Sequence, residues 1–467
     1  MNKKIISLFV LLSVLVISFA GCTTVKEIEE VDNVLYPEKE WSMIDSTNTT
    51  AVEIKIWIPN SATSSMGEAI TNLVNLYNQE QALTYPGKNI TVVPEFQGTS
   101  GALNTKLQAA ILANNNPVLS AIGVSSVPLY QERSIDLRTV LTYDEIKGLN
   151  QGLLQYSLYN GKFVLKNYFP SESNIIVENK TLIESKGFTL PTPDSIISNP
   201  EESTWTWNEF LNIAKGVTTI DTENDAESVY GFATGSVDPI GMMFQQGGKL
   251  YNDNITDIEF DKDDKIKKGL EFWKSLVTEN AMRNPNSRSN HSTIITSEFY
   301  TGKVGMIYTT SSNLKTMHEK ATEGNFEVEV LPFPKESQFF TNQGGSGIII
   351  LDNKPQKEIN AAANFMKWLL DAKNNAYMCL QTGYIPVNPN ANETVALKSV
   401  YEDYPMLKTV TSYMQFGIRS PQGKAKAAVD SKVNAYAKQI WSEPDKSIDQ
   451  IINELISEAK YEIEANK

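Results

Sequence analysis

Side chains able to do acid–base or nucleophilic chemistry are few in this chain. It contains two histidines, His291 and His318, and neither has a second ligand at a spacing that metal sites use. Both lie in polar segments, so we expect solvated surface positions. The sequence "GGSGI" at 344–348 lacks the last glycine of the G-x-S-x-G nucleophile motif. With so few histidines a catalytic triad has no evident base, and the sequence predicts no enzyme, no metal site and no cofactor.

Two further motifs and one cysteine also lack the partners that chemistry needs. The segment "GIRSPQGKA", residues 417–425, approaches a phosphate-binding loop, but its glycines are one residue too far apart and Ala425 replaces the metal-binding hydroxyl. The acidic run "FDKDDK", residues 260–265, lacks the glycine and the final glutamate of a calcium loop, which favours a solvated turn. Cys379 lies in a predicted apolar helix, where we expect a buried thiol.

The first residues have the pattern of an export signal. An uncharged apolar run, residues 5–20, follows two lysines and ends before Gly21 and Cys22. The run is short for a spanning helix, which needs about 20 apolar residues. The pattern resembles the bacterial lipoprotein signal, with Phe19 where leucine is usual, and ordinary secretion is the alternative. The resemblance implies a lipid on Cys22, so we expect an extracytoplasmic protein held at the cell membrane by that lipid.

Composition restricts the class of partner. The chain of 467 residues has a net charge of −14, which argues against nucleic acid as a partner and against broad electrostatic attachment to anionic lipid. Its length accommodates two domains of ordinary size, and we expect a monomer. Residues 23–50 are acidic and then rich in serine, threonine and asparagine, without a sustained period. That stretch predicts a flexible tether.

The folded part begins with alternating strands and helices. Apolar residues alternate along 52–58 and 90–96, which predicts strands, and helical spacing follows each of them, near 68–78 and 103–111. This order is typical of a parallel sheet with helices on its faces. A strand, a turn and a helix are predicted again in 173–188. Further helices are predicted at 203–215, 267–277, 356–370, 424–441 and 448–462, and further strands at 304–308, 326–331 and 347–351.

Five phrases together resemble a known family, the extracellular solute-binding proteins of ABC importers, which includes the maltose- and glycerol-3-phosphate-binding proteins. They are, in order, "TWTWNEFLNIAK" (204–215), "QQGGKLYNDN" (245–254), "EFYTGKVGMIYTTSS" (298–312), "GGSGIII" (344–350) and "LQTGYIPVN" (380–388). The resemblance implies an α/β fold of two lobes, the type II-like periplasmic-binding-protein fold, with a ligand cleft between lobes joined by hinge crossings. We expect the crossings near 169–174, 334–340 and 384–388.

The resemblance also implies how the chain divides. Residues 1–21 are the expected signal peptide, and residues 22–51 are the lipidated cysteine and the tether. The first lobe is expected to comprise 52–170 and 338–384, and the second lobe 171–337 and 385–467.

Ligand-binding positions follow from the same resemblance, residue by residue. The implied set comprises Ser171 and Ser173 at the first crossing, Ser311 and Ser312 after a strand, the paired Gly344 and Gly345, Tyr384 of "TGY", and Lys424, with Phe244 as a candidate stacking aromatic. Lys424 stands where the glycerol-3-phosphate family has an arginine, so the charge is kept and the planar bidentate group is lost. A glutamate of that family is missing near Val124.

The implied function is a lipid-anchored binding protein that captures a small polar solute, first a sugar, and delivers it to the membrane subunits of an ABC permease. Aromatic platforms that stack on sugars in the maltose protein are missing after Tyr308 and near Lys424. A glycerol-3-phosphate or other phosphorylated-polyol binding protein is therefore the alternative. A secreted hydrolase and an adhesin are less favoured classes.

Overall fold

The computed structural model describes residues 42–47, 50–123, 126–154, 157–159, 162–164, 166–172, 175–341, 343–417 and 421–466. The predicted signal peptide, Cys22, most of the tether, Val124 and Ser173 lie outside these ranges. Across the described ranges, no helix has both the length and the apolar character that crossing a membrane requires.

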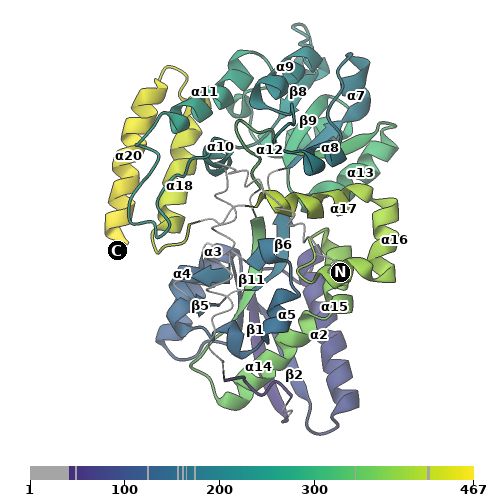
Figure 1. Cartoon of the computed structure of the whole chain (residues 1–467), viewed down its shortest axis with the longest axis vertical. Coiled ribbons are helices and arrows are strands. Elements are labelled where there is room, and N and C mark those ends of the chain that lie inside the picture. The colour runs from purple at the N-terminus through teal and green to yellow at the C-terminus, as the bar shows by residue number, and fades with distance from the viewer. Residues whose placement is uncertain are drawn as a thin grey trace, which may run out of the picture. The chain divides into compact units, whose positions relative to one another are not determined.

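Five strands form the first sheet, in the order β2-β1-β3-β11-β6 (Figure 1). The strands β1 (Val52–Ile58), β2 (Ile90–Phe96) and β3 (Leu119–Gly123) are parallel to one another, and β11 (Gln343–Ile350) is antiparallel to β3 and to β6 (Lys166–Glu172). The predicted parallel sheet is therefore a mixed one. β11 enters this sheet from another sheet, so no helical crossover fixes its direction.

Helices cover the first sheet as the apolar spacing predicts. α2 (Ser65–Thr84) packs against β2 and against α15 (Ala372–Thr382), α14 (Gln356–Leu369) packs against β1, and α3 (Ser100–Leu112) packs against β3 (Figure 1). The buried face of α2 includes Ile70, Leu73, Val74 and Tyr77, at the spacing read from the sequence. These side chains leave water together, and that burial stabilises the layer.

A second sheet has the order β10-β7-β9-β8. Its strands are β10 (Val328–Pro332), β7 (Ile175–Asn179), β9 (Val304–Thr309) and β8 (Tyr230–Ala233). β7 is antiparallel to both neighbours, and β8 is parallel to β9. α9 (Trp207–Val217) packs against β8 and α12 (His291–Tyr300) against β9, over an aromatic core in which Trp273 stacks on Phe333 with ring centroids 5.3 Å apart.

Two long helices lie near the end of the chain. α18 (Lys426–Ala437) and α20 (Ile448–Ala465) pack together, and α20 also contacts α11 (Lys265–Thr278) (Figure 1). The single helix predicted at 424–441 is divided into α18 and α19 (Gln439–Ser442). Shorter helices connect these elements. They include α7 (Lys180–Ser185), α8 (Pro193–Ser198), α10 (Pro239–Gln245), α13 (Leu314–Glu323), η7 (Ser311–Asn313), η8 (Pro389–Glu393), α16 (Val395–Asp403), α17 (Pro405–Ser412) and η9 (Tyr413–Phe416).

The chain passes between the two sheets at defined places. It leaves the first sheet at Glu172, the end of β6, and enters the second at Ile175, the start of β7. It returns between Pro332, which ends β10, and Gln343, which begins β11. These passages overlap residues 169–174 and 334–340. Beyond α15, both η8 and α16 pack against α15, whereas α17 contacts β10.

Candidate functional site

The run of small polar residues after β9 forms the short helix η7. In open α/β sheets, ligands bind outside the carboxyl ends of the parallel strands, and this is such an end, because β8 and β9 are parallel. Ser311 is buried, at 1% exposure. The Oγ1 of Thr310 and the Oγ of Ser312 lie 2.6 Å apart, and Asn313 Nδ2 donates to Thr309 Oγ1 at 2.9 Å. These hydrogen bonds hold several hydroxyl groups together at one end of the sheet.

The end of α15 lies against this hydroxyl run. Gly383 has φ 69°, and a Cβ at that position would be 3.4 Å from the carbonyl oxygen of Ser311 and 3.5 Å from the Cα of Ser312. Tyr384 follows, half-buried, and its N–H donates to Thr382 Oγ1 at 3.3 Å. Burial raises the pKa of Tyr384 above its ordinary value, so its phenol is a neutral donor at physiological pH.

A third segment joins the same region through the pairing of β6 with β11. Ser171 lies opposite Gly344, and Pro170 lies opposite Gly345, whose φ of 100° requires glycine. β6 also contacts η7. The structure therefore brings most of the predicted serines and glycines together with Tyr384. Ser173 lies outside the described residues.

Asp238 is a polar residue at this edge that the resemblance did not single out. It follows β8, which ends at the same edge as β9 because the two strands are parallel. Its Oδ2 accepts a hydrogen bond from the hydroxyl of Tyr308 at 3.0 Å, and its Oδ1 accepts from the N–H of Gly241 at 2.9 Å, which caps α10. The Asp-Pro pair at 238–239 is a helix-start signal that could have located it.

Two other predicted positions have different surroundings. Phe244 is 5% exposed and stacks on Phe340, with ring centroids 4.9 Å apart and planes 16° apart. Its carbonyl accepts from Gln338 Nε2 at 2.7 Å, so it packs against the returning chain between β10 and β11. Lys424 lies exposed in the turn that precedes α18, and none of the contacts above includes it.

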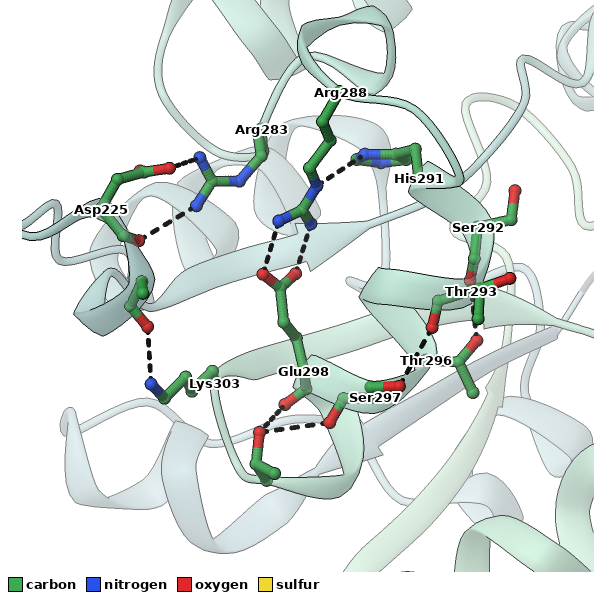
Figure 2. A network of polar contacts seen from close by, with 12 residues as sticks. Asp225, Arg283, Arg288, His291, Ser292, Thr293, Thr296, Ser297, Glu298 and Lys303 are labelled. Atoms are coloured by element: carbon green, nitrogen blue, oxygen red, sulfur yellow. Dashed lines mark hydrogen bonds and ion pairs between the residues drawn. The ribbon is translucent and has the colours of Figure 1, made fainter.

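His291 is not at the solvated surface, as its polar neighbours predicted, but is 7% exposed at the start of α12. Its Nδ1 accepts from Arg288 Nε at 3.4 Å, and Arg288 donates to both carboxylate oxygens of Glu298 at 2.7 and 2.6 Å (Figure 2). Burial lowers the pKa of His291, so the ring is neutral at physiological pH. The prediction of a surface position for His291 was wrong. Arg288 and Glu298, ten residues apart, form an ion pair with each other, so the charged neighbourhood of His291 does not need to be solvated.

The remaining reactive residues have structural surroundings. His318 is half-buried, and its ring meets Tyr404 edge to face at 5.3 Å, so it too is less exposed than predicted. Cys379 is buried on α15 beside Ala376, Ala391 and Leu397, and burial raises the pKa of its thiol, as expected for an inert cysteine. No group of three or more metal-ligating side chains comes together in the described ranges.

Sequence comparison adds a family to this geometry. A family model described as bacterial extracellular solute-binding protein matches residues 72–409, which is most of the chain. The chain belongs to this family. The family consists of binding proteins, so the predicted family and the prediction that the chain is not an enzyme are both confirmed. No curated protein sequence matches this solute-binding protein significantly.

Solved structures are similar over nearly the whole of their own length. The cyclic alpha-maltosyl-1,6-maltose binding protein from Arthrobacter globiformis is 18% identical with a TM-score of 0.69, covering 89% of this chain and 99% of that one. The sugar-binding protein MalE from Xanthomonas citri is 14% identical with a TM-score of 0.71, covering 89% and 98%. An ABC substrate-binding protein from Listeria monocytogenes in complex with cycloalternan is 18% identical with a TM-score of 0.65, covering 90% and 97%. The likeness confirms the periplasmic-binding-protein fold.

Proposed function

We propose that this solute-binding protein serves an ABC importer, is anchored by a lipid on Cys22, and captures a small polar solute, first a sugar. Proteins with similar structures are described as binding sugars, including cyclic alpha-maltosyl-1,6-maltose and cycloalternan. The export-signal pattern before Cys22 supports the anchor. Delivery of the solute to membrane-embedded permease subunits follows from this role.

The observation that carries this proposal is the contact of Gly383, the residue before Tyr384, with the backbone of Ser311 and Ser312. Hydroxyl groups and a neutral phenol are donors and acceptors that match the hydroxyls of a sugar or polyol. Gly383 places the two segments in contact, and its φ of 69° is a conformation that favours glycine. We propose that Ser171, Ser173, Phe244, Gly344, Gly345 and Lys424 complete the ligand site, together with Asp238.

Closure of two lobes on the solute is the proposed mechanism. Strands from 52–172 and 343–350 share the first sheet, and strands from 175–332 share the second, which supports the lobe division at the first two crossings. The third crossing was expected near 384–388, but the packing of η8 and α16 on α15 and of α17 against β10 supports a place between α16 and α17 instead. A solute bound by both lobes stabilises the closed form by its differential affinity, as periplasmic binding proteins do.

A phosphorylated polyol is the second candidate, and Lys424 is the observation that favours it. Its exposed ammonium in the turn before α18 is available to a phosphate as a point charge. The hydroxyls of η7 and the glycine amides of β11 also suit phosphate oxygens. The two candidates differ in their dependence on Lys424, because a neutral sugar gains little from a lysine ammonium.

A thermal-shift panel separates the candidates. Mono- and oligosaccharides and glycerol 3-phosphate are added to the purified protein, to Lys424→Gln and to Lys438→Gln, which removes another exposed lysine from the end of α18. A ligand at 100 times its Kd stabilises the protein by about 2.7 kcal/mol, so binding is read directly as a rise in Tm. We expect a sugar to raise the Tm of the wild type and of Lys438→Gln equally, and that of Lys424→Gln slightly less, because the lysine ammonium is only one of several donors to its hydroxyls.

Each other outcome of the panel has a defined meaning. A rise with glycerol 3-phosphate alone, lost in Lys424→Gln and kept in Lys438→Gln, selects the phosphorylated polyol and rejects the sugar. No rise with any member of either class contradicts the assignment of a sugar or polyol phosphate as the solute.

A further inference from the structure

Two glutamates face each other across the pairing of β7 with β10. Glu178 on β7 lies opposite Glu329 on β10 in the antiparallel register, so both side chains stand on the same face of the sheet as direct neighbours. Glu178 is 2% exposed, and its Oε2 has no hydrogen-bond partner among the described residues. Two charged carboxylates in this position would repel each other in surroundings from which water is largely excluded.

A small cavity of about 40 Å³ adjoins the pair, between the two strands and the segments that carry α7 and α8. Glu178, Glu329, Glu184, Lys180 and Thr192 are among its lining residues. The cavity is separate from the candidate ligand site, because Glu178 lies opposite Met306, whereas Ile175 lies opposite Thr309 at the end of β9. The described residues contain no group of three metal-ligating side chains, so this cavity does not offer the set of ligands that a divalent cation needs.

The hydrogen bonds distinguish the two carboxyl groups. Glu329 is half-buried, and its Oε1 accepts from the N–H of Val330 at 3.3 Å, which stabilises a charge on Glu329. Burial raises the pKa of Glu178 to about 8, and the negative charge of Glu329 acts in the same direction. Burial also raises the pKa of Glu329 above its ordinary value, despite the bond from Val330.

We propose that Glu178 and Glu329 form a coupled carboxyl pair that holds one proton, on Glu178, and that this proton couples the stability of the second sheet to the pH outside the cell. Protonation of Glu178 removes one of two adjacent negative charges. The other charge stays on Glu329, whose carboxylate accepts a hydrogen bond from the N–H of Val330. Such coupled groups titrate as a pair, so the behaviour described below belongs to the pair as a unit.

The other charged and titratable groups around the pair come from each neighbouring element. Lys180, at the start of α7, favours the charged form of both glutamates, but its Nζ also lies 4.0 Å from the carboxylate of Glu327. The carboxylates of Glu184 on α7 and Asp194 on α8 add negative charge, which favours the proton.

On the remaining sides of the pair, the nearby groups in the described part of the chain are Tyr413 and His318. Tyr413 of η9 is buried, and its hydroxyl donates to the carbonyl of Val330 at 2.7 Å. Burial raises the pKa of that phenol, so Tyr413 stays neutral. His318 of α13 lines a neighbouring cavity together with Lys180 and Glu329. Deprotonation of Glu178 would therefore leave an additional negative charge beside the strand β10, to which Tyr413 anchors η9.

The sign of the pH dependence follows from the direction of the shift. Below about pH 4, Glu178 holds its proton in both the folded and the unfolded chain, so its contribution to stability is complete. Between about pH 4.3 and pH 8 only the folded chain holds the proton, and the contribution is lost progressively as the pH rises. Above about pH 8 the proton is gone from both states and the loss is complete.

Urea unfolding of the purified protein between pH 5 and pH 9 tests the proposal, with Glu178→Gln as the variant and Glu184→Gln as the control. Glutamine resembles the protonated acid in shape and cannot ionise, and Glu184 is an exposed glutamate that lines the same cavity. The unfolding equilibrium constant of the wild type, divided by that of Glu178→Gln, is expected to rise about tenfold per pH unit up to pH 8 and then level. Glu184→Gln is expected to follow the wild type closely, because the charge of this exposed carboxylate is screened by water and contributes least to the shift of Glu178.

Infrared spectroscopy of the wild type keeps the proposal testable if the variant does not fold. A band from a protonated carboxylic acid is expected at pH 7, and it should disappear by about pH 9.5. The proposal is overturned by a wild type without that band at pH 7, or by unfolding curves of wild type and Glu178→Gln that change in parallel with pH. It is also overturned if calcium or magnesium raises the Tm of the wild type and leaves that of Glu178→Gln unchanged, because a cation would then occupy the pair.

Discussion

At the scale of single residues, Gly383 lies at the contact between two segments of the candidate site. Its φ of 69° lies in the left-handed region, and its missing side chain faces the backbone of Ser311 and Ser312. The next residue is Tyr384, which we propose contacts the solute. A side chain at 383 would therefore act on two proposed ligand-binding segments at once.

We predict that Gly383→Ala weakens solute binding, whereas Gly187→Ala does not. Gly187 has a similar φ of 83°, but a Cβ there meets no atom within 4 Å. Both variants should lose about 1 kcal/mol of unfolding free energy, because alanine is strained at positive φ. Urea unfolding gives the two stabilities, and the Tm rise with the solute found in the panel gives the binding.

Equal solute-induced Tm rises in Gly383→Ala and Gly187→Ala would contradict the placement of this turn in the ligand site. If only Gly383→Ala loses unfolding free energy, the loss comes from the contact of the new side chain with Ser311 and not from backbone strain.

Single residues also mark the limit of what the sequence reveals about the site. Ser311, Ser312 and Tyr384 were expected from short phrases, and the structure brings their segments together. Asp238 was not singled out, because its contact with Tyr308 joins residues 70 positions apart and depends on strands that lie side by side. His291 was expected at the surface for a similar reason, since its ion-paired neighbours have the composition of solvated sequence.

At the scale of elements, α20 illustrates how a periodic sequence produces a packed helix. Ser447 caps its first turn in a capping box with Gln450, and the buried residues of the helix are Ile451, Leu455, Ala459 and Ile463, each four positions after the last. This stripe packs against α18, the helix that follows the turn of Lys424. The packing of α20 therefore helps to hold that turn in place.

We predict that Leu455→Ala lowers the free energy of unfolding by about 2–5 kcal/mol, because it leaves a cavity in a fully buried stripe. Tyr461→Ala on the same helix is the matched control, since Tyr461 is 67% exposed and its removal empties no core space. Urea unfolding monitored by far-UV circular dichroism measures both. A change below about 1 kcal/mol in Leu455→Ala would show that α20 is not part of the cooperative core.

Helices and strands with a regular spacing of apolar residues could be predicted from the sequence, whereas the connections between them were harder to predict. β1 and β2 have the bounds that were read from alternating residues, and the predicted helices at 267–277 and 356–370 match α11 and α14 within a few residues. The antiparallel direction of β11 was missed, because direction depends on the passage from the second sheet and leaves no periodic signal. The break between α18 and α19 was missed because buried residues continue through Ile440 and Trp441.

At the scale of the whole molecule, two sheets are connected by passages of the chain. The passages at 172–175 and 332–343 separate segments that belong to different sheets. Family membership identifies a solute-binding protein, and the solved structures share its fold. The contact of Gly383 with η7 joins α15 to the end of a strand of the second sheet, and α15 packs against α2, a helix that covers the first sheet.

We propose above all that a small polar solute binds between the two lobes and closes them. Small-angle X-ray scattering of the purified protein, with and without the sugar that gives the largest Tm rise, tests this claim most directly. We predict a smaller radius of gyration with the sugar, and an unchanged radius with a sugar that gives no Tm rise. A sugar that raises the Tm while leaving the radius of gyration unchanged would contradict closure around the solute.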